Sequence, residues 1–170
     1  PHNLPLQVTS FVGRERELAT LGALQVQVEE GRGQVVGMVG EPGVGKSRLC
    51  YEFIRAHVAH GWRCLEASAA SYDKSTPYRP VIDLLKAYFQ LEAGDDLQTR
   101  HTKIADKLLM LDATLQPILP ALLVLLEVQV EEPKWQTLDP PQRRRDIIDA
   151  IKHLLLRESQ VQPLCLVVEN

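Results

Sequence analysis

Residues 40–47 read Gly40-Glu41-Pro42-Gly43-Val44-Gly45-Lys46-Ser47, and this stretch decides the fold. It fits the pattern G-x-x-x-x-G-K-S/T of a phosphate-binding loop at every fixed position. Glycine allows backbone conformations that a Cβ would forbid, and it allows a close approach to a ligand. Successive N–H groups can then line a concavity that holds a phosphate, helped by the dipole of a following helix. The alternative interpretation is a glycine-rich turn that matches the pattern by chance.

The sequence on either side of this loop favours the phosphate-binding interpretation. Residues 34–39 form a short apolar run that is typical of a buried strand, and residues 48–60 have the pattern of a helix. Strand, glycine-rich loop and helix in this order are the context that the pattern requires. We therefore predict that all residues of the loop contact a nucleotide. Lys46 is expected to reach the β- and γ-phosphates, and the Ser47 hydroxyl is expected to ligate Mg²⁺. Arg48 is either a surface residue or lies close to the nucleotide.

The composition excludes several classes of protein. The chain of 170 residues has a formal net charge of −3 at pH 7 and only 5% aromatic residues. Neither a basic face for nucleic acid nor a base-stacking platform is therefore expected. The longest apolar stretch, residues 121–130, is interrupted by Glu127 and is too short to span a bilayer. We expect a cytoplasmic protein with no signal peptide, no membrane contact and no direct contact to nucleic acid.

The rest of the chain predicts an α/β fold with a parallel sheet. A first helix is expected over residues 13–30, and residues 34–67 are expected to form a unit of strand, loop, helix and second strand. A last strand is expected at residues 164–169. We therefore predict three parallel strands in a three-layer sandwich, with the long segment 68–160 inserted between the second and third strands.

The segment 68–160 is expected to be mostly helical. Apolar residues recur at helical spacing over residues 80–91, 99–115 and 140–158, and Asp139 is placed to cap the last of these helices. Residues 121–128 fit a short buried helix or a strand, and the excess of Leu over Val favours the helix. The arginine run 143–145 fits a solvated helix face or a phosphate contact, and the solvated face is favoured.

The last strand carries the candidate for the second half of a nucleotide site. Residues 164–169 are Leu-Cys-Leu-Val-Val-Glu, an apolar run that ends in a carboxylate. Nucleotide chemistry needs such an acidic group on a neighbouring strand to hold the Mg²⁺ shell and position water. Glu169 is therefore predicted to serve the metal, and Lys46 and Glu169 are the candidate catalytic residues. The alternative is an ordinary buried strand that happens to end in an acid.

A family resemblance adds to these predictions. Residues 11–18, Phe-Val-Gly-Arg-Glu-Arg-Glu-Leu, precede the loop and resemble the corresponding segment of AAA+-like P-loop ATPases of the signalling (STAND) type. The resemblance is closest to the origin-recognition-like ATPase module of cyclase-linked tetratricopeptide-repeat proteins and large LuxR-type regulators. Residues 75–80 and 138–145 are similar to the same module. The resemblance implies one ATPase domain over residues 1–170 that binds ATP and Mg²⁺, with Val12, Gly13 and Arg14 near the adenine.

Two departures from the family pattern affect what the resemblance implies. The acidic strand usually ends in two acidic residues, whereas this chain has Glu169 followed by Asn170. An amide cannot act as a general base, so ATP binding is expected and ATP hydrolysis depends on the position that Asn170 takes. The family also has a later strand between the loop strand and the acidic strand. Because that strand is missing from this sequence, we expect the chain to be the truncated N-terminal part of one domain in a longer protein.

Three functions are compatible with the sequence. The first is a slow ATPase that acts as a signalling switch for attached effector and repeat domains of the same chain, with assembly into a homo-oligomer left open. The effector would be a cyclase or a transcriptional output. The second is a scaffold module that holds ATP as a structural ligand without hydrolysis, motivated by Asn170. The third, a small-molecule phosphotransferase, is disfavoured because residues 68–160 show no substrate-binding cluster of Arg, Asp and aromatic residues.

Overall fold

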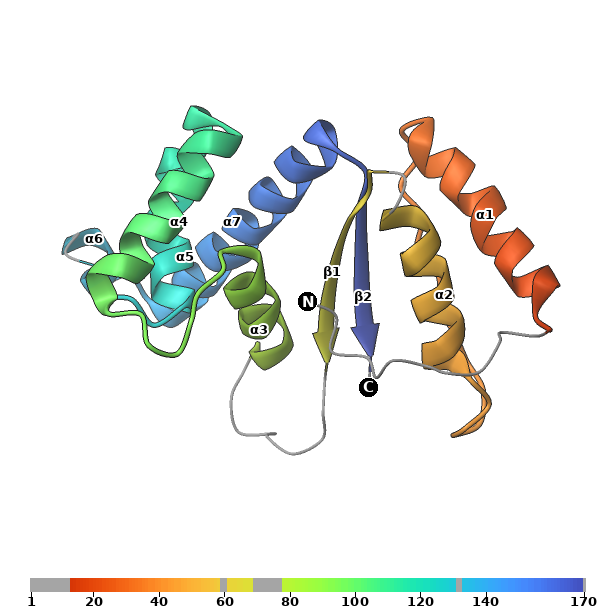
Figure 1. The fold of residues 1–170 in the computed structure, drawn as a ribbon. Coiled ribbons are helices and arrows are strands. Elements are labelled where there is room, and N and C mark those ends of the chain that lie inside the picture. Colours follow the sequence, from red (N-terminus) through yellow and green to blue (C-terminus); the bar gives the residue numbers. More distant parts are fainter. Residues whose placement is uncertain (1–12, 59–60, 69–77, 131–132, 170) are drawn as a thin grey trace. The chain divides into compact units, whose positions relative to one another are not determined.

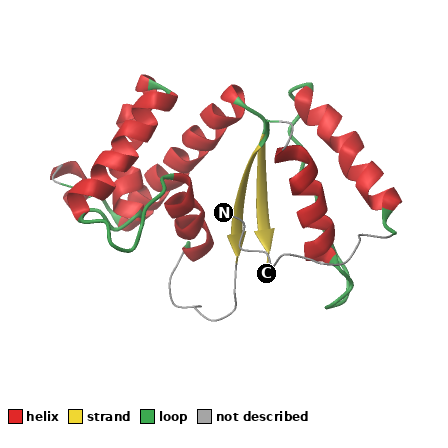
Figure 2. Ribbon diagram, viewed as in Figure 1, coloured by secondary structure: helices red, strands yellow, loops and turns green. Residues whose placement is uncertain are grey.

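The computed structural model describes residues 13–58, 61–68, 78–130 and 133–169 (Figure 1). The chain divides into two compact units, Pro1–Trp62 and Arg63–Asn170. In the described residues, helices supply most of the regular structure and two strands form a single sheet (Figure 2). The predicted α/β class with a parallel sheet is therefore confirmed. The extent of one ATPase domain over residues 1–170 stays a prediction.

The first unit contains α1 (Glu15–Glu29) and α2 (Lys46–Val58), which are in contact. The apolar side chains of Leu21 in α1 and of Leu49 and Ile54 in α2 are buried. The indole Nε1 of Trp62 donates a hydrogen bond to Glu29 Oε1 at 3.4 Å. Both helices predicted around the loop are thus present, and α2 begins two residues earlier than expected because the loop runs directly into it.

The predicted strand at residues 34–39 is wrong. Residues 32–41 have no regular secondary structure, and the side chains of Val35 and Val39 are fully exposed, at 101% and 99%. An apolar run becomes a strand only when a neighbour satisfies its N–H and C=O groups. The two strands among the described residues pair with each other and leave this run without a ladder partner there. Within the described ranges the sheet therefore has two strands instead of the predicted three, and the three-layer sandwich stays a prediction.

The second unit contains the sheet. Strands β1 (Arg63–Ser68) and β2 (Leu164–Glu169) run side by side in the same direction (Figure 1), with Arg63 opposite Leu164 and Ser68 opposite Glu169. This confirms the two later strands of the prediction and their parallel pairing. Because the strands are parallel, their carboxyl ends lie at the same edge, so Glu169 stands at that edge beside the end of β1.

Helices fill the described residues between the two strands. They are α3 (Arg79–Tyr88), α4 (Leu97–Leu111), the 3₁₀ helix η1 (Ala113–Ile118), α5 (Leu119–Leu125), α6 (Pro133–Thr137) and α7 (Pro140–Val161). Helix α5 decides between the two alternatives for residues 121–128 in favour of the helix. The most deeply buried apolar side chains come from these helices and from the residue after α5: Leu85, Ile104, Leu108, Leu122, Leu126 and Leu154. The helices therefore form one core with each other and with β1. That they are an insertion in the family fold stays a prediction.

Aspartate side chains cap the beginnings of α4, η1 and α7. Asp139 accepts a hydrogen bond from the Gln142 N–H at 2.8 Å, as predicted for the start of α7. The single helix predicted over residues 99–115 is divided, because Asp112 has extended backbone and ends α4. Its carboxylate caps η1 and accepts a hydrogen bond from Arg157 Nε at 2.6 Å.

A buried carboxylate joins three elements of the second unit. Glu158 in α7 is only 2% exposed. It accepts hydrogen bonds from Tyr88 Oη at 2.6 Å and Gln162 Nε2 at 2.8 Å, and it forms an ion pair with Arg63 Nε at 2.5 Å. Burial alone raises the pKa of Glu158, but the hydrogen bonds from Tyr88 and Gln162 and the charge of Arg63 outweigh it and lower the pKa below its ordinary value of 4.5. The carboxylate therefore links α7 to the end of α3 and the start of β1.

Replacement of Glu158 by Gln is expected to lower the free energy of unfolding by about 2 kcal/mol at pH 7. The reason is that Arg63 loses the charge of its buried partner, the Glu158 carboxylate. A folded pKa below the unfolded one means that this contribution is present above the unfolded pKa and is lost as the pH falls through the folded pKa. The difference between wild type and Glu158→Gln should therefore shrink below about pH 4. Urea denaturation of both proteins at pH 7 and pH 3.5 measures it.

The matched control is Asp149→Asn, on the same helix. Asp149 pairs with Lys152 at 3.2 Å, and both side chains are largely exposed, at 60% and 64%. Exposed pairs contribute little, so this variant should change the free energy of unfolding by less than about 0.5 kcal/mol. A loss in Glu158→Gln that is no larger than in the control, or that persists unchanged at pH 3.5, contradicts the assignment.

Candidate functional site

The loop of residues 40–47 has the backbone that its sequence predicts. Gly43 and Gly45 have φ angles of 79° and 90°, in the region that favours glycine. Pro42 and Gly43 are the central residues of a turn in which the Val44 N–H donates to the Glu41 carbonyl at 3.4 Å. Positive φ at the third position with Pro at the second is typical of a type II turn. The sequence Pro-Gly therefore shapes the start of the loop.

The Lys46 side chain folds back over the loop. Its Nζ donates to the carbonyl oxygens of Gly40 at 2.8 Å and Glu41 at 3.0 Å. The chain is tight at this point, since a Cβ on Gly40 would lie 3.1 Å from a methyl group of Val44. The Lys46 ammonium is thus held within the curve of the loop, at the place where the motif predicts a phosphate contact.

The start of α2 adds groups that attract an anion. Lys46 and Ser47 are the first two residues of the helix. The Leu49 N–H donates a hydrogen bond to the carbonyl of Gly45, the residue before the helix, at 3.0 Å. None of the hydrogen bonds among the described residues uses the N–H groups of Gly45, Lys46 or Ser47. The first turn of α2 also contains no acidic side chain. Free N–H groups and an uncompensated helix dipole fit a phosphate, and the exposed Ser47 hydroxyl fits a metal shell.

The predicted residues on either side of the loop are Arg48, which follows it, and the segment of Val12, Gly13 and Arg14, which precedes α1. Arg48 forms an ion pair with Glu52 at 2.7 Å, one turn further along α2. Val12 lies outside the described residues. Gly13 and Arg14 precede α1 with φ angles of 84° and 66°. The left-handed conformation costs a residue with a Cβ about 1–2 kcal/mol, so Arg14 is held in a strained backbone.

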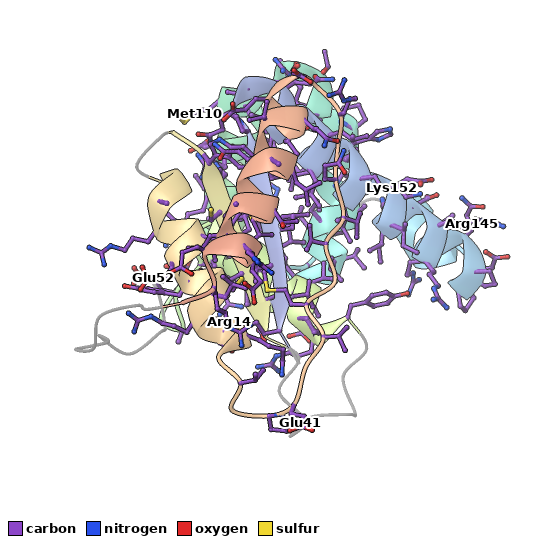
Figure 3. The ribbon with its side chains drawn as sticks, turned by 90° about the vertical axis from the view of Figure 1, so that its right-hand side faces the viewer. Arg14, Glu41, Glu52, Met110, Arg145 and Lys152 are labelled. Atoms are coloured by element: carbon purple, nitrogen blue, oxygen red, sulfur yellow. The ribbon has the colours of Figure 1, made fainter. Side chains whose placement is uncertain are left out.

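The Arg14 side chain reaches the phosphate-binding loop. Its Nη2 donates to the main-chain carbonyl of Val44, and its Nη1 lies 3.4 Å from Glu17 Oε1. Figure 3 labels Arg14 at the start of α1 and Glu41 in the loop that leads to α2. Sequence reasoning missed this contact, because two segments 30 residues apart carry no shared periodicity that could indicate it. The predicted role of Gly13 and Arg14 as adenine contacts stays a prediction.

The second predicted half of the site lies in the other unit. Glu169 is the last residue of β2 and is partly exposed. Asn170 lies outside the described residues. Ser47 belongs to the first unit and Glu169 to the second, so their shared Mg²⁺ shell stays a prediction. The described part of the chain contains no group of three or more His, Cys, Asp or Glu side chains that could hold a metal ion.

The arginine run on α7 makes structural contacts. Arg143 donates to the Trp135 carbonyl at 2.9 Å, Arg145 donates to Gln142 Oε1 at 2.8 Å, and the Arg144 guanidinium lies 5.8 Å from the ring centre of Tyr78. Arg145 and Lys152, both labelled in Figure 3, project from α7. This agrees with the favoured interpretation of a solvated helix face.

Comparison with known proteins points to one family. The family model described as "AAA ATPase domain" matches residues 10–170. Searches of curated proteins and of solved structures returned no match. Among the described residues, no helix has the length and apolar character needed to cross a membrane. The match spans nearly the whole chain and includes the loop at residues 40–47, so the chain belongs to the AAA ATPase domain family.

Proposed function

We propose that this chain is the ATP- and Mg²⁺-binding module of a cytoplasmic, multidomain signalling protein of the STAND type, and that it works as a slow ATPase switch. The observation that carries the proposal is the position of Lys46, whose ammonium is held over the loop carbonyls beside the free N–H groups that open α2. Membership of the AAA ATPase domain family supports ATP with Mg²⁺ as the ligand.

The roles of the loop residues follow from their chemistry. Lys46 exchanges its two carbonyl partners for phosphate oxygens, which are stronger acceptors because they carry charge. The N–H groups of Gly45, Lys46 and Ser47 hold the phosphate chain, and the Ser47 hydroxyl ligates the cation. ATP supplies the phosphoanhydride bond, and Mg²⁺ supplies the neutralising charge when both are bound. Gly13 and Arg14, together with Val12, make up the segment proposed to lie near the adenine.

Hydrolysis is proposed to depend on the end of β2. Glu169 serves the Mg²⁺ shell and orients water, while Asn170 occupies a position that is usually acidic in the family. An amide can hold water by hydrogen bonds but cannot accept its proton. A low rate of turnover fits a switch, because the bound state then persists long enough to be reported to attached effector and repeat domains. A homo-oligomer of the whole protein is compatible with this role.

The specific observation of Asn170 also favours a second function. In this alternative the module binds ATP as a permanent structural ligand and does not hydrolyse it. A small-molecule phosphotransferase has less support. The arginine run at residues 143–145, which is the candidate contact for a phosphorylated substrate, is engaged with Trp135, Tyr78 and Gln142.

Replacement of Lys46 by Ala is expected to weaken the binding of ATP–Mg²⁺ by about 10- to 100-fold, because one charge-assisted contact is lost. Isothermal titration of the full-length protein measures the affinity. Lys152→Ala, which removes an exposed lysine from α7, is the control and should bind like wild type. Equal affinities of wild type and Lys46→Ala contradict the proposed site.

Steady-state phosphate release by the full-length protein separates the two functions. Slow release that is lost in Lys46→Ala supports the switch. No release by wild type, together with a gain in Asn170→Asp, supports the structural ligand, because the new carboxylate can accept a proton from water.

Replacement of Gly45 by Ala is expected to reduce ATP affinity about tenfold, because the φ of 90° strains any residue with a Cβ and the loop must change shape. Gly33→Ala is the matched control, since Gly33 has no positive φ and open space where a Cβ would lie. The control should retain wild-type affinity. Titration calorimetry compares the three proteins, and equal affinities of the two variants contradict the conformational requirement.

A further inference from the structure

One contact in the first unit joins the residue before α1 to the phosphate-binding loop. The Arg14 guanidinium donates to the carbonyl of Val44, in the middle of the phosphate-binding loop, and it also pairs with Glu17 in the first turn of α1. The backbone of Arg14 lies in the left-handed region, where glycine or asparagine would be less strained. The side chain that contacts Val44 is therefore carried by a strained residue. Strain of this kind is typical of residues that serve a functional site.

The Val44 carbonyl belongs to the peptide group that also contains the Gly45 N–H. A trans peptide is planar, so its C=O and N–H point in opposite directions. The glycine at 45 makes this peptide easy to rotate, because both signs of φ are accessible to it. A donor that holds the Val44 carbonyl on one side therefore keeps the Gly45 N–H directed to the other side. The hydrogen bonds among the described residues leave that N–H available.

We infer that Arg14 is a positioning residue for phosphate binding: it holds the Val44–Gly45 peptide in the orientation that presents the Gly45 N–H to the phosphate chain. The inference rests on the proposed ATP site and assigns Arg14 to its phosphate end. An Arg14 that acted through the adenine would influence only ligands that carry the base. An Arg14 that acts through the peptide influences every ligand with a phosphate chain.

The first test compares two ligands in the full-length protein. Titration calorimetry with ATP–Mg²⁺ and with inorganic tripolyphosphate–Mg²⁺ should show that Arg14→Ala weakens both by the same factor, about tenfold. Arg14→Lys retains a donor of similar reach and should recover most of the affinity for both. Arg16→Ala removes the same charge two residues further along, in the first turn of α1, and should bind both ligands like wild type. A loss confined to ATP overturns the inference, and so does the absence of measurable tripolyphosphate binding to wild type.

The second test needs no ligand. The ¹⁵N–¹H signal of Gly45 should shift, and its amide hydrogen should exchange at a different rate, in Arg14→Ala but not in Arg16→Ala, because only the first variant frees the peptide. Arg14→Gly should show the same change at Gly45 without a lower melting temperature, since glycine relieves the strained φ. An unchanged Gly45 amide in both Arg14 variants overturns the inference. Failure of the ATP site itself has a different signature, which is equal ATP binding by wild type and Lys46→Ala.

Discussion

The positive φ angles of Gly43 and Gly45 are the constraint on which the candidate site depends. They turn the chain sharply enough that Lys46, at the start of α2, lies over the carbonyls of Gly40 and Glu41. They also leave the intervening peptide free to rotate, and the contact from Arg14 to Val44 restrains it. Flexible glycine thus makes the loop possible, and two basic side chains of the first unit give it a definite shape.

The second unit is held together by the packing of its sheet against helices and by one buried carboxylate. Its two parallel strands bury one face against helices, and parallel pairing requires the long helical connection that separates them. Glu158 holds the edge of the sheet at which β1 begins, because it binds Arg63 at the start of β1 and Tyr88 at the end of α3. Glu169 stands at the opposite, carboxyl edge. The polar network therefore stabilises the edge of the sheet at which the strands begin, and Glu169 lies at the other edge.

Local patterns in the sequence predicted much of this structure. The loop, the helix after it, the cap at Asp139 and the last strand are each specified by neighbouring residues, so they could be predicted. The strand at 34–39 could not be judged locally, because an apolar run needs a partner in the sheet. The hydrogen bond from Arg157 to Asp112 and the contact of Arg14 with Val44 join residues that are far apart along the chain, so neither could be predicted. The burial of Glu158 depends on partners from β1, from α3 and from the end of α7. A glutamate near the end of a helix is usually solvated, so the sequence alone does not indicate this burial.

The central claim is that residues 40–47 hold the phosphate chain of ATP through main-chain N–H groups. Titration of ¹⁵N-labelled protein with ATP–Mg²⁺ tests it most directly, because each amide reports its own surroundings. We expect saturable shifts that are largest at Gly45, Lys46 and Ser47 and that disappear in Lys46→Ala. Absence of saturable shifts in this loop, or shifts centred instead on the arginine run 143–145 of α7, would contradict it.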